Sequence, residues 1–173
     1  MSVTYARSAL AALLLLPASA GAEPQVGDRF GDWSFECTAQ SATRIDCGLA
    51  QLVVIAESRE PIARFRITGP AEPAAEDAAA TPGQLSVLLP LGLDLQAGVT
   101  ASTDTGTTLP LSVATCVQQG CLLTAPVTDE IVAALREGAQ MNVGFALYGN
   151  GQSLEIAGSL AGLDAAFTET GWY

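Results

Sequence analysis

The chain has 173 residues, 49% of them hydrophobic, and a formal net charge of −11 at pH 7, with no histidine and no lysine. This acidic balance excludes nucleic acid as the main partner, because affinity for phosphate backbones comes mainly from Lys and Arg. The missing residue types exclude histidine bases, histidine metal ligands, Ser-His and Cys-His nucleophile pairs, Schiff bases and a Walker lysine. We therefore predict no cofactor.

Residues 1–22 have the pattern of a secretory signal peptide. Arg7 lies in a short positive leader, residues 9–16 form an apolar run, and the small residues at 18–22 offer cleavage sites. The apolar run is too short to span a membrane, which disfavours the alternative of an uncleaved anchor. Cleavage after Ala22 leaves one domain, residues 23–173, whose net charge is −12 because Arg7 is lost. We expect a periplasmic protein that is not integral to a membrane, with the cell surface or secretion as alternatives.

Alternating apolar residues open the mature chain. Trp33, Phe35 and Cys37 fall on one face of an extended segment, which predicts a strand with its aromatic side chains in the core. After a loop, residues 48–56 form a nearly continuous apolar run. This run predicts a largely buried strand that pairs with the next one in a hairpin.

The next predicted strand, residues 62–68, carries most of the chain's basic cluster. Its apolar residues are predicted to face the core, while Arg64 and Arg66 face solvent. With Arg59 they form a small basic patch, most simply a solvated sheet surface screened by the acidic loop that follows. The alternative is a contact with an anion or a protein partner, for which Arg64 and Arg66 are the candidate residues.

Residues 70–83 separate two predicted strands. The segment has no β-branched residue before Thr81 and no apolar face, so it cannot bury enough surface to offset the entropy of ordering it. We expect a mobile loop or a frayed helical turn. Its acidic residues at 72–77 are read as solvated, with a docking role as the alternative.

Residues 84–121 contain three further predicted strands. Leu85, Val87 and Leu89 share one face of the first, which ends at Pro90 because proline has no N–H to donate. Residues 99–104 and 111–116 supply the second and third strands, separated by turns that contain glycine and proline.

The same region resembles a known family. The segment LLPLGLDLQAGVTASTDTG, followed by a cysteine, a short loop ending in glycine and a second cysteine, is similar to the signature of the invasion-associated locus B family of exported bacterial proteins. The family's opening Gly-Asp-Trp and closing Ser-Leu-x-Gly segments are matched at 31–33 and 159–163. The resemblance spans about residues 30 to 167, and it implies an immunoglobulin-like β-sandwich with a role linked to host-cell invasion in pathogenic relatives.

The four cysteines are expected to be oxidised in an exported chain. Of three possible pairings, closeness in sequence favours Cys37 with Cys47 and Cys116 with Cys121, and the resemblance implies the same local pairing. A redox pair is the alternative. It is disfavoured because four residues, rather than two, separate Cys116 from Cys121.

The last third of the chain combines a helix with a hairpin. Residues 122–127 predict a short strand, and residues 128–138 a helix capped by Thr128 and stopped at Gly138. Alternation over 141–148 and 154–160, around a Gly-Asn-Gly turn, predicts the hairpin. Residues 162–170 predict a turn or two of helix, and residues 171–173 are left unassigned.

Eight or nine short strands, one short helix and no βαβ rhythm predict an all-β, antiparallel sandwich. Catalytic candidates are limited to close carboxylate pairs, which are weak because a glycosidase needs two carboxyls held across a cleft. These pairs are Asp28 with Asp32, Glu57 with Glu60, and Asp129 with Glu130. Residues 104–107 lack the ligand spacing of a calcium loop and are read as a turn.

The function predicted is therefore not catalytic. We expect an exported envelope or surface protein that acts by contact with an unidentified protein partner, in the envelope or on a host cell. The alternative is a periplasmic small-ligand binder with a pocket between the sheets near Trp33, Phe35, Phe145 and Tyr148. An enzyme ranks third, and the sequence does not predict an oligomeric state.

Overall fold

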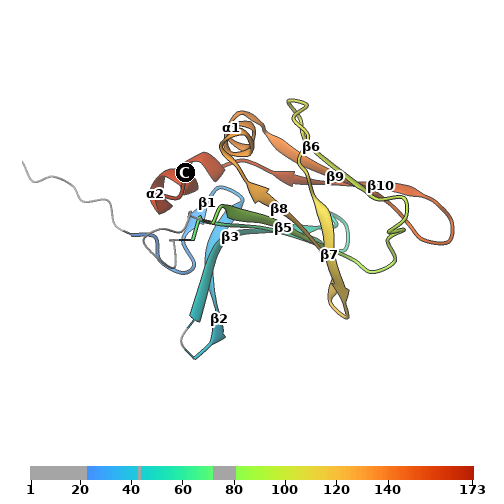
Figure 1. Cartoon of the computed structure of the whole chain (residues 1–173), viewed down its shortest axis with the longest axis horizontal. Coiled ribbons are helices and arrows are strands. Elements are labelled where there is room, and N and C mark those ends of the chain that lie inside the picture. The colour runs from blue at the N-terminus through green and yellow to red at the C-terminus, as the bar shows by residue number, and fades with distance from the viewer. Residues whose placement is uncertain (1–22, 43, 72–80) are drawn as a thin grey trace, which may run out of the picture.

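The computed structural model describes residues 23–42, 44–71 and 81–173. In those ranges two antiparallel sheets and two helices, α1 (Asp129–Glu137) and α2 (Leu163–Thr170), surround one core (Figure 1). The larger sheet contains, in spatial order, β1 (Arg29–Phe30), β2 (Trp33–Ser41), β3 (Arg44–Val54), β4 (Pro61–Thr68), β5 (Gly83–Leu89), β8 (Gly120–Val127) and β7 (Ser112–Val117). The smaller sheet contains β10 (Ser153–Ser159), β9 (Gln140–Ala146) and β6 (Val99–Thr103). The predicted antiparallel sandwich is confirmed, with sheets of unequal size.

Period-two alternation decides which face of the larger sheet is buried. Phe65, Val87 and Leu123 lie side by side in the register of β4, β5 and β8, and each is 0% exposed. The smaller sheet and both helices cover this inner face with their own apolar side chains, among them Met141, Leu135 and Phe167. The predicted inward faces of 62–68 and 85–89 are therefore correct.

The apolar run at 48–56 is buried only in its first half. Leu49, Ala50 and Gln51 are buried, whereas Leu52 is 58% and Ile55 37% exposed. The prediction of a largely buried strand is wrong for the second half, because the described residues place no second layer of backbone over the outer face of β3. Side chains from neighbouring strands cover only its beginning.

The helix predicted over 128–138 is confirmed as α1. The hydroxyl of Thr128 accepts a hydrogen bond from the N–H of Ile131, and the predicted apolar residues Ile131, Val132 and Leu135 are buried. Gly138 follows the helix with φ −79°, an angle that any residue can adopt. Glycine is needed at this position for its lack of a side chain and not for access to the left-handed backbone region. A side chain there would meet the carboxylate of Asp104 at 2.9 Å.

A second helix, α2, corrects the expectation of one short helix. It spans eight residues and follows Gly162, whose φ is 88°. It confirms the turn or two of helix predicted at 162–170, although its start has no side-chain cap and depends instead on a close approach to β1. A Cβ at Gly162 would meet the carbonyl oxygen of Phe30 at 2.2 Å.

The unassigned tail, residues 171–173, packs against the core. The Trp172 and Phe35 ring centroids are 5.9 Å apart, and the Tyr173 hydroxyl donates to the carbonyl of Thr68 at 3.0 Å. Arg136 on α1 donates to the main-chain oxygen of Tyr173 at 2.9 Å. The tail therefore joins α1 to the end of β4.

The predicted signal peptide, residues 1–22, lies outside the described residues, as do residues 72–80 of the predicted loop. The ends of that loop are described. Ala71 and Thr81 pair through both backbone hydrogen bonds, and Gly83 already belongs to β5. In the described part of the chain, no helix is both long and apolar enough to cross a membrane.

Candidate functional site

Both predicted disulfides are confirmed. Cys37 and Cys47 face each other across β2 and β3, and Cys116 and Cys121 do so across β7 and β8. Each bridge joins directly opposite residues of one hairpin, so it fixes the register of that hairpin and not the packing of the two sheets. No cysteine is free, which leaves no thiol for nucleophilic or metal chemistry.

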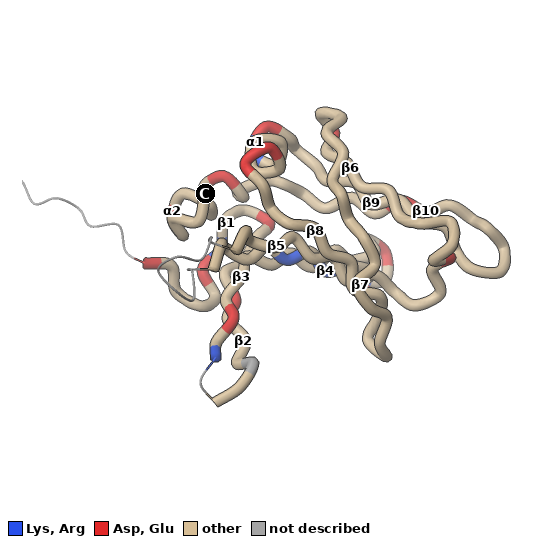
Figure 2. Tube along the Cα trace, in the orientation of Figure 1, with Lys and Arg blue, Asp and Glu red and all other residues tan. Residues whose placement is uncertain are grey.

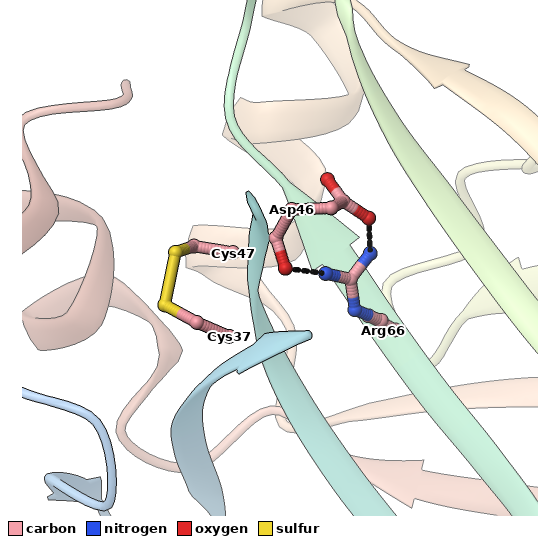
Figure 3. The surroundings of a disulfide bond; sticks show 4 residues. All are labelled: Cys37, Asp46, Cys47 and Arg66. Atoms are coloured by element: carbon pink, nitrogen blue, oxygen red, sulfur yellow. Dashed lines mark hydrogen bonds and ion pairs between the residues drawn. A yellow bond between two sulfur atoms is a disulfide. The ribbon is translucent and has the colours of Figure 1, made fainter. Parts of the chain in front are cut away.

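The two candidate contact residues, Arg64 and Arg66, project from β4 onto the outer face of the larger sheet. Arg66 forms an ion pair with Asp46 at 2.9 Å and donates a second bond to the Asp46 main-chain oxygen at 3.1 Å. Figure 3 shows this pair on the side of β3 opposite the Cys37–Cys47 bridge. Arg64 pairs with Glu36 of β2, so its side chain reaches across β3.

Small residues on β3 allow these arginines to lie flat. A Cβ at Gly48 would meet the Arg66 guanidinium at 2.7 Å, so any larger residue there would lift Arg66 from the sheet. Ala50, beside Gly48 on the same face, is only 3% exposed. In the sequence, the small residues Gly48 and Ala50 on one face of this strand indicate that neighbouring side chains cover that face. The prediction attributed them instead to burial of the whole run at 48–56.

The arginines are neutralised differently from the prediction. Their partners Glu36 and Asp46 come from β2 and β3, while the acidic residues at 72–77 lie outside the described residues. Arg59, the third member of the predicted cluster, lies in the turn after β3 with φ 61°. The basic cluster is therefore a pair on the sheet and a separate residue in a turn.

Apolar side chains continue the outer face beyond Arg64. The register places Leu52, Arg64, Leu88 and Leu122 in one row across β3, β4, β5 and β8. A hollow of about 380 Å³ beside this row is lined by Leu52, Ile62, Arg64, Leu88, Pro90 and Gln119, among others. The outer face thus combines two solvent-accessible ion pairs with exposed apolar side chains, a mixture typical of protein interfaces. We call this row and its ion pairs the Arg64 face.

The aromatic residues proposed to line a ligand pocket do not form one. Trp33, Phe35 and Phe145 are 1%, 8% and 7% exposed and belong to the packed core, while Tyr148 is 79% exposed on the surface. Because three of these side chains are packed in the core and the fourth is exposed to solvent, they do not line a common cavity. The predicted pocket between the sheets is therefore not supported.

The two segments that resemble the family's opening and closing motifs meet in space. The Trp33 indole N–H donates to the Ser159 carbonyl at 3.0 Å, and the Asp32 N–H donates to the Ala161 carbonyl at 3.1 Å. A Cβ at Gly31 would meet that same Ala161 oxygen at 2.4 Å. These motifs therefore join the first strands to the end of β10, which is a structural role.

Sequence reasoning missed Gln51, which completes this junction. It is 6% exposed, and its side-chain amide bonds to the Ser159 main chain in both directions at 2.9 Å. The Gln51 side-chain amide thus makes the same two hydrogen bonds to Ser159 that a neighbouring backbone would make, and it links β3 of one sheet to β10 of the other. A polar residue inside the apolar run at 48–56 was the available signal.

Four of the six carboxylates named from the sequence, Asp28, Glu60, Asp129 and Glu130, have a hydrogen-bond partner or lie at a helix end. Asp28 accepts from the Gln25 N–H at 2.7 Å, and Asp129 and Glu130 are exposed in the first turn of α1. Asp104 accepts from the N–H groups of Ala139 and Gln140, at 3.0 and 3.3 Å, and so closes the turn before β9. Across residues 23–42, 44–71 and 81–173, no group of three or more Cys, Asp or Glu is placed to hold a metal ion.

Comparison with known proteins gives concordant results. The family model described as invasion associated locus B protein matches residues 33–171. Invasion protein B homologs of Brucella abortus strain 2308 and biovar 1 strain 9-941 are each 26% identical over 167 residues, covering 96% of this chain and 91% of the relative.

A solved structure agrees in fold. The crystal structure of invasion associated protein B from Bartonella henselae superposes with a TM-score of 0.66 at 19% identity, covering 84% of this chain and 95% of that one. With the family model spanning most of the described domain, the assignment is direct: the chain belongs to the invasion associated locus B family.

Proposed function

We propose that this protein is an exported envelope protein that acts by protein–protein contact through the Arg64 face, and not by catalysis. The observation that carries the proposal is the composition of that face, where Arg64 stands between exposed Leu52 and half-buried Leu88 on a sheet surface with no described layer over it. Arginine is enriched at protein interfaces, and the buried centre of an interface is more apolar than the rest of the surface. The names of the Brucella relatives support a role in invasion.

The Arg64–Glu36 ion pair of this face is suited to exchange of partners. The Arg64 and Glu36 side chains are 43% and 39% exposed, and exposed pairs of this kind contribute about 0–1 kcal/mol. A carboxylate on a partner can therefore replace Glu36 at small cost, and exclusion of water by the neighbouring leucines would strengthen the new pair.

Partner capture tests this proposal. Crosslinking in intact cells followed by mass spectrometry identifies a partner, whose retention is then compared between the native chain and an Arg64→Ser/Arg66→Ser variant. We expect the variant to lose retention. The matched control, Arg29→Ser/Arg59→Ser, removes the same charge from β1 and a turn and should retain the partner. Equal retention by all three folded proteins would refute a role for the Arg64 face.

Export is tested separately. Two disulfides within single hairpins fit an oxidising compartment. We expect fractionation of the native host to place the protein outside the cytoplasm, with an intact mass that corresponds to residues 23–173 and two disulfides. A full-length, reduced protein in the cytoplasmic fraction would contradict this part of the proposal without bearing on the Arg64 face.

A further inference from the structure

The free edges of the two sheets are protected to different degrees. β1 has two residues, which is too short for a ladder. The outer edge of β6 is covered by residues 107–109, since Thr103 N–H donates to Thr107 O at 2.9 Å and Leu109 N–H to Ala101 O at 2.8 Å. Of the two remaining edges among the described residues, β7 is open, and β10 is open except at Ser159, whose N–H and C=O bond to Gln51.

These two open edges differ in charge. β10 carries Glu155 in its middle, exposed to solvent. β7 has six residues, of which five are exposed, and none is charged. Proteins usually guard an open edge with a charged side chain, proline or a bulge. β7 has only a bulge, between Val113 and Thr115.

The absence of charge extends well beyond β7. No Asp, Glu, Lys or Arg occurs between Asp104 and Asp129, although the chain as a whole carries a net charge of −11. Figure 2 shows β7 and β8 as an uninterrupted tan segment, whereas the acidic residues are spread over other parts of the chain, among them α1, β3 and the neighbourhood of β10. Pairing of two copies through this strand therefore places no charged side chain of β7 opposite another.

We propose that two copies of the chain associate through antiparallel pairing of β7 with β7 of the second copy. The pairing continues the seven-stranded sheet across a two-fold axis, so each copy offers the same residues to the other. Its driving force is the satisfaction of the unpaired N–H and C=O groups on the outer edge of β7. The same arrangement at β10 places two Glu155 side chains near each other, and like charges across a strand pair are destabilising.

Salt concentration distinguishes this interface from one made by ion pairs. The net charge of each copy opposes association, and salt screens that repulsion over a distance of about 10 Å at 0.1 M. Pairing through an uncharged edge therefore strengthens as salt is added. An interface in which the Arg64 face of one copy contacts acidic residues of the other would weaken under the same change.

The experiment measures mass in solution. Sedimentation or light scattering of residues 23–173 at rising protein concentration should show a species of twice the monomer mass, more abundant at high salt. Thr115→Asp adds a charge at an exposed position of β7 and should abolish that species. The matched control, Ala157→Asp, adds the same charge at an exposed position of β10 and should leave the dimer intact. Urea unfolding confirms that both variants are folded.

Hydrogen exchange locates the contact independently. We expect the amides of residues 112–117 to exchange more slowly in concentrated than in dilute protein, with no such change in residues 153–159. A chain that stays monomeric at every salt and protein concentration would overturn the proposal. So would a dimer that Ala157→Asp dissociates and Thr115→Asp does not, because it would place the contact at β10.

Discussion

A single amide side chain connects the two sheets. Because Gln51 is buried and bonds to both the N–H and the C=O of Ser159, we expect Gln51→Leu to leave the Ser159 N–H, which is partly buried, without its partner. The carbonyl keeps the bond from Trp33. A buried unsatisfied donor costs about 1–3 kcal/mol, and urea denaturation should show a loss of that size.

The control for this prediction is the same substitution at an exposed strand position. Gln84 lies in β5 with its side chain in solvent, so Gln84→Leu should change the free energy of unfolding by less than about 0.5 kcal/mol. Equal effects at the two positions would mean that the Gln51 amide does not join the sheets.

Tyr173 makes stability depend on alkaline pH. Burial raises the pKa of its hydroxyl from 10.0 to about 12, because the charged phenolate would lose contact with water. The folded chain therefore holds this proton more tightly than the unfolded chain does. Its stabilising contribution is complete below pH 10 and is lost as the pH rises from 10 to about 12.

Two measurements check the Tyr173 prediction in a chain of residues 23–173. Tyrosinate absorbance should show one group titrating near pH 12, which disappears in Tyr173→Phe and remains in Tyr148→Phe. The free energy of unfolding of Tyr173→Phe should fall less steeply above pH 10 than that of the native chain. Parallel declines would show that burial does not hold the proton.

At the scale of elements, each disulfide holds one hairpin. Loop closure predicts a loss of about 2–3 kcal/mol for each Cys→Ala double variant, slightly more for Cys37/Cys47, with a sequence separation of 10, than for Cys116/Cys121, with 5. Urea denaturation should find both variants folded and less stable by those amounts. Failure of either variant to fold would mean that the bridge stabilises the core itself.

Elements with local signals were predictable, and contacts between segments distant in the sequence were not. α1 has its cap and apolar stripe within eleven residues, and the β9–β10 hairpin has its turn between its strands. α2 was expected at 162–170, but its attachment depends on the approach of Gly162 to Phe30, more than 130 residues earlier, and nothing near Gly162 encodes that. The Arg64 face was foreseen in position, whereas its carboxylate partners, on two other strands, were not.

At the scale of the whole molecule, the division of strands between sheets is also non-local. β6 follows β5 in sequence, yet it pairs with β9 in the smaller sheet, while β5 pairs with β8. Alternation identifies each strand but does not distinguish these partners, since every strand concerned has one apolar face. The sequence therefore predicts a sandwich without predicting that it divides into seven strands and three.

Net charge acts on the whole chain. With 18 acidic and 7 basic residues, the folded state concentrates negative charge that the unfolded chain spreads out. We expect the free energy of unfolding to rise as sodium chloride increases from low to physiological concentration, measured at low protein concentration. Thr115→Asp should show the same rise, which separates this effect from self-association. A fall with salt would mean that the three ion pairs outweigh the repulsion.

The segment between β4 and β5 begins and ends at two residues, Ala71 and Thr81, that are hydrogen-bonded to each other, and this pairing has a practical consequence. Ala71 and Thr81 are held together by two backbone bonds, while Trp172 and Tyr173 occupy the space left by Gly69 and Gly83 beneath them. The two ends of the connection are thus anchored side by side, independently of what lies between residues 72 and 80. A foreign epitope or fluorescent label can be grafted between them, and the protein can be followed in living cells with both its termini unmodified.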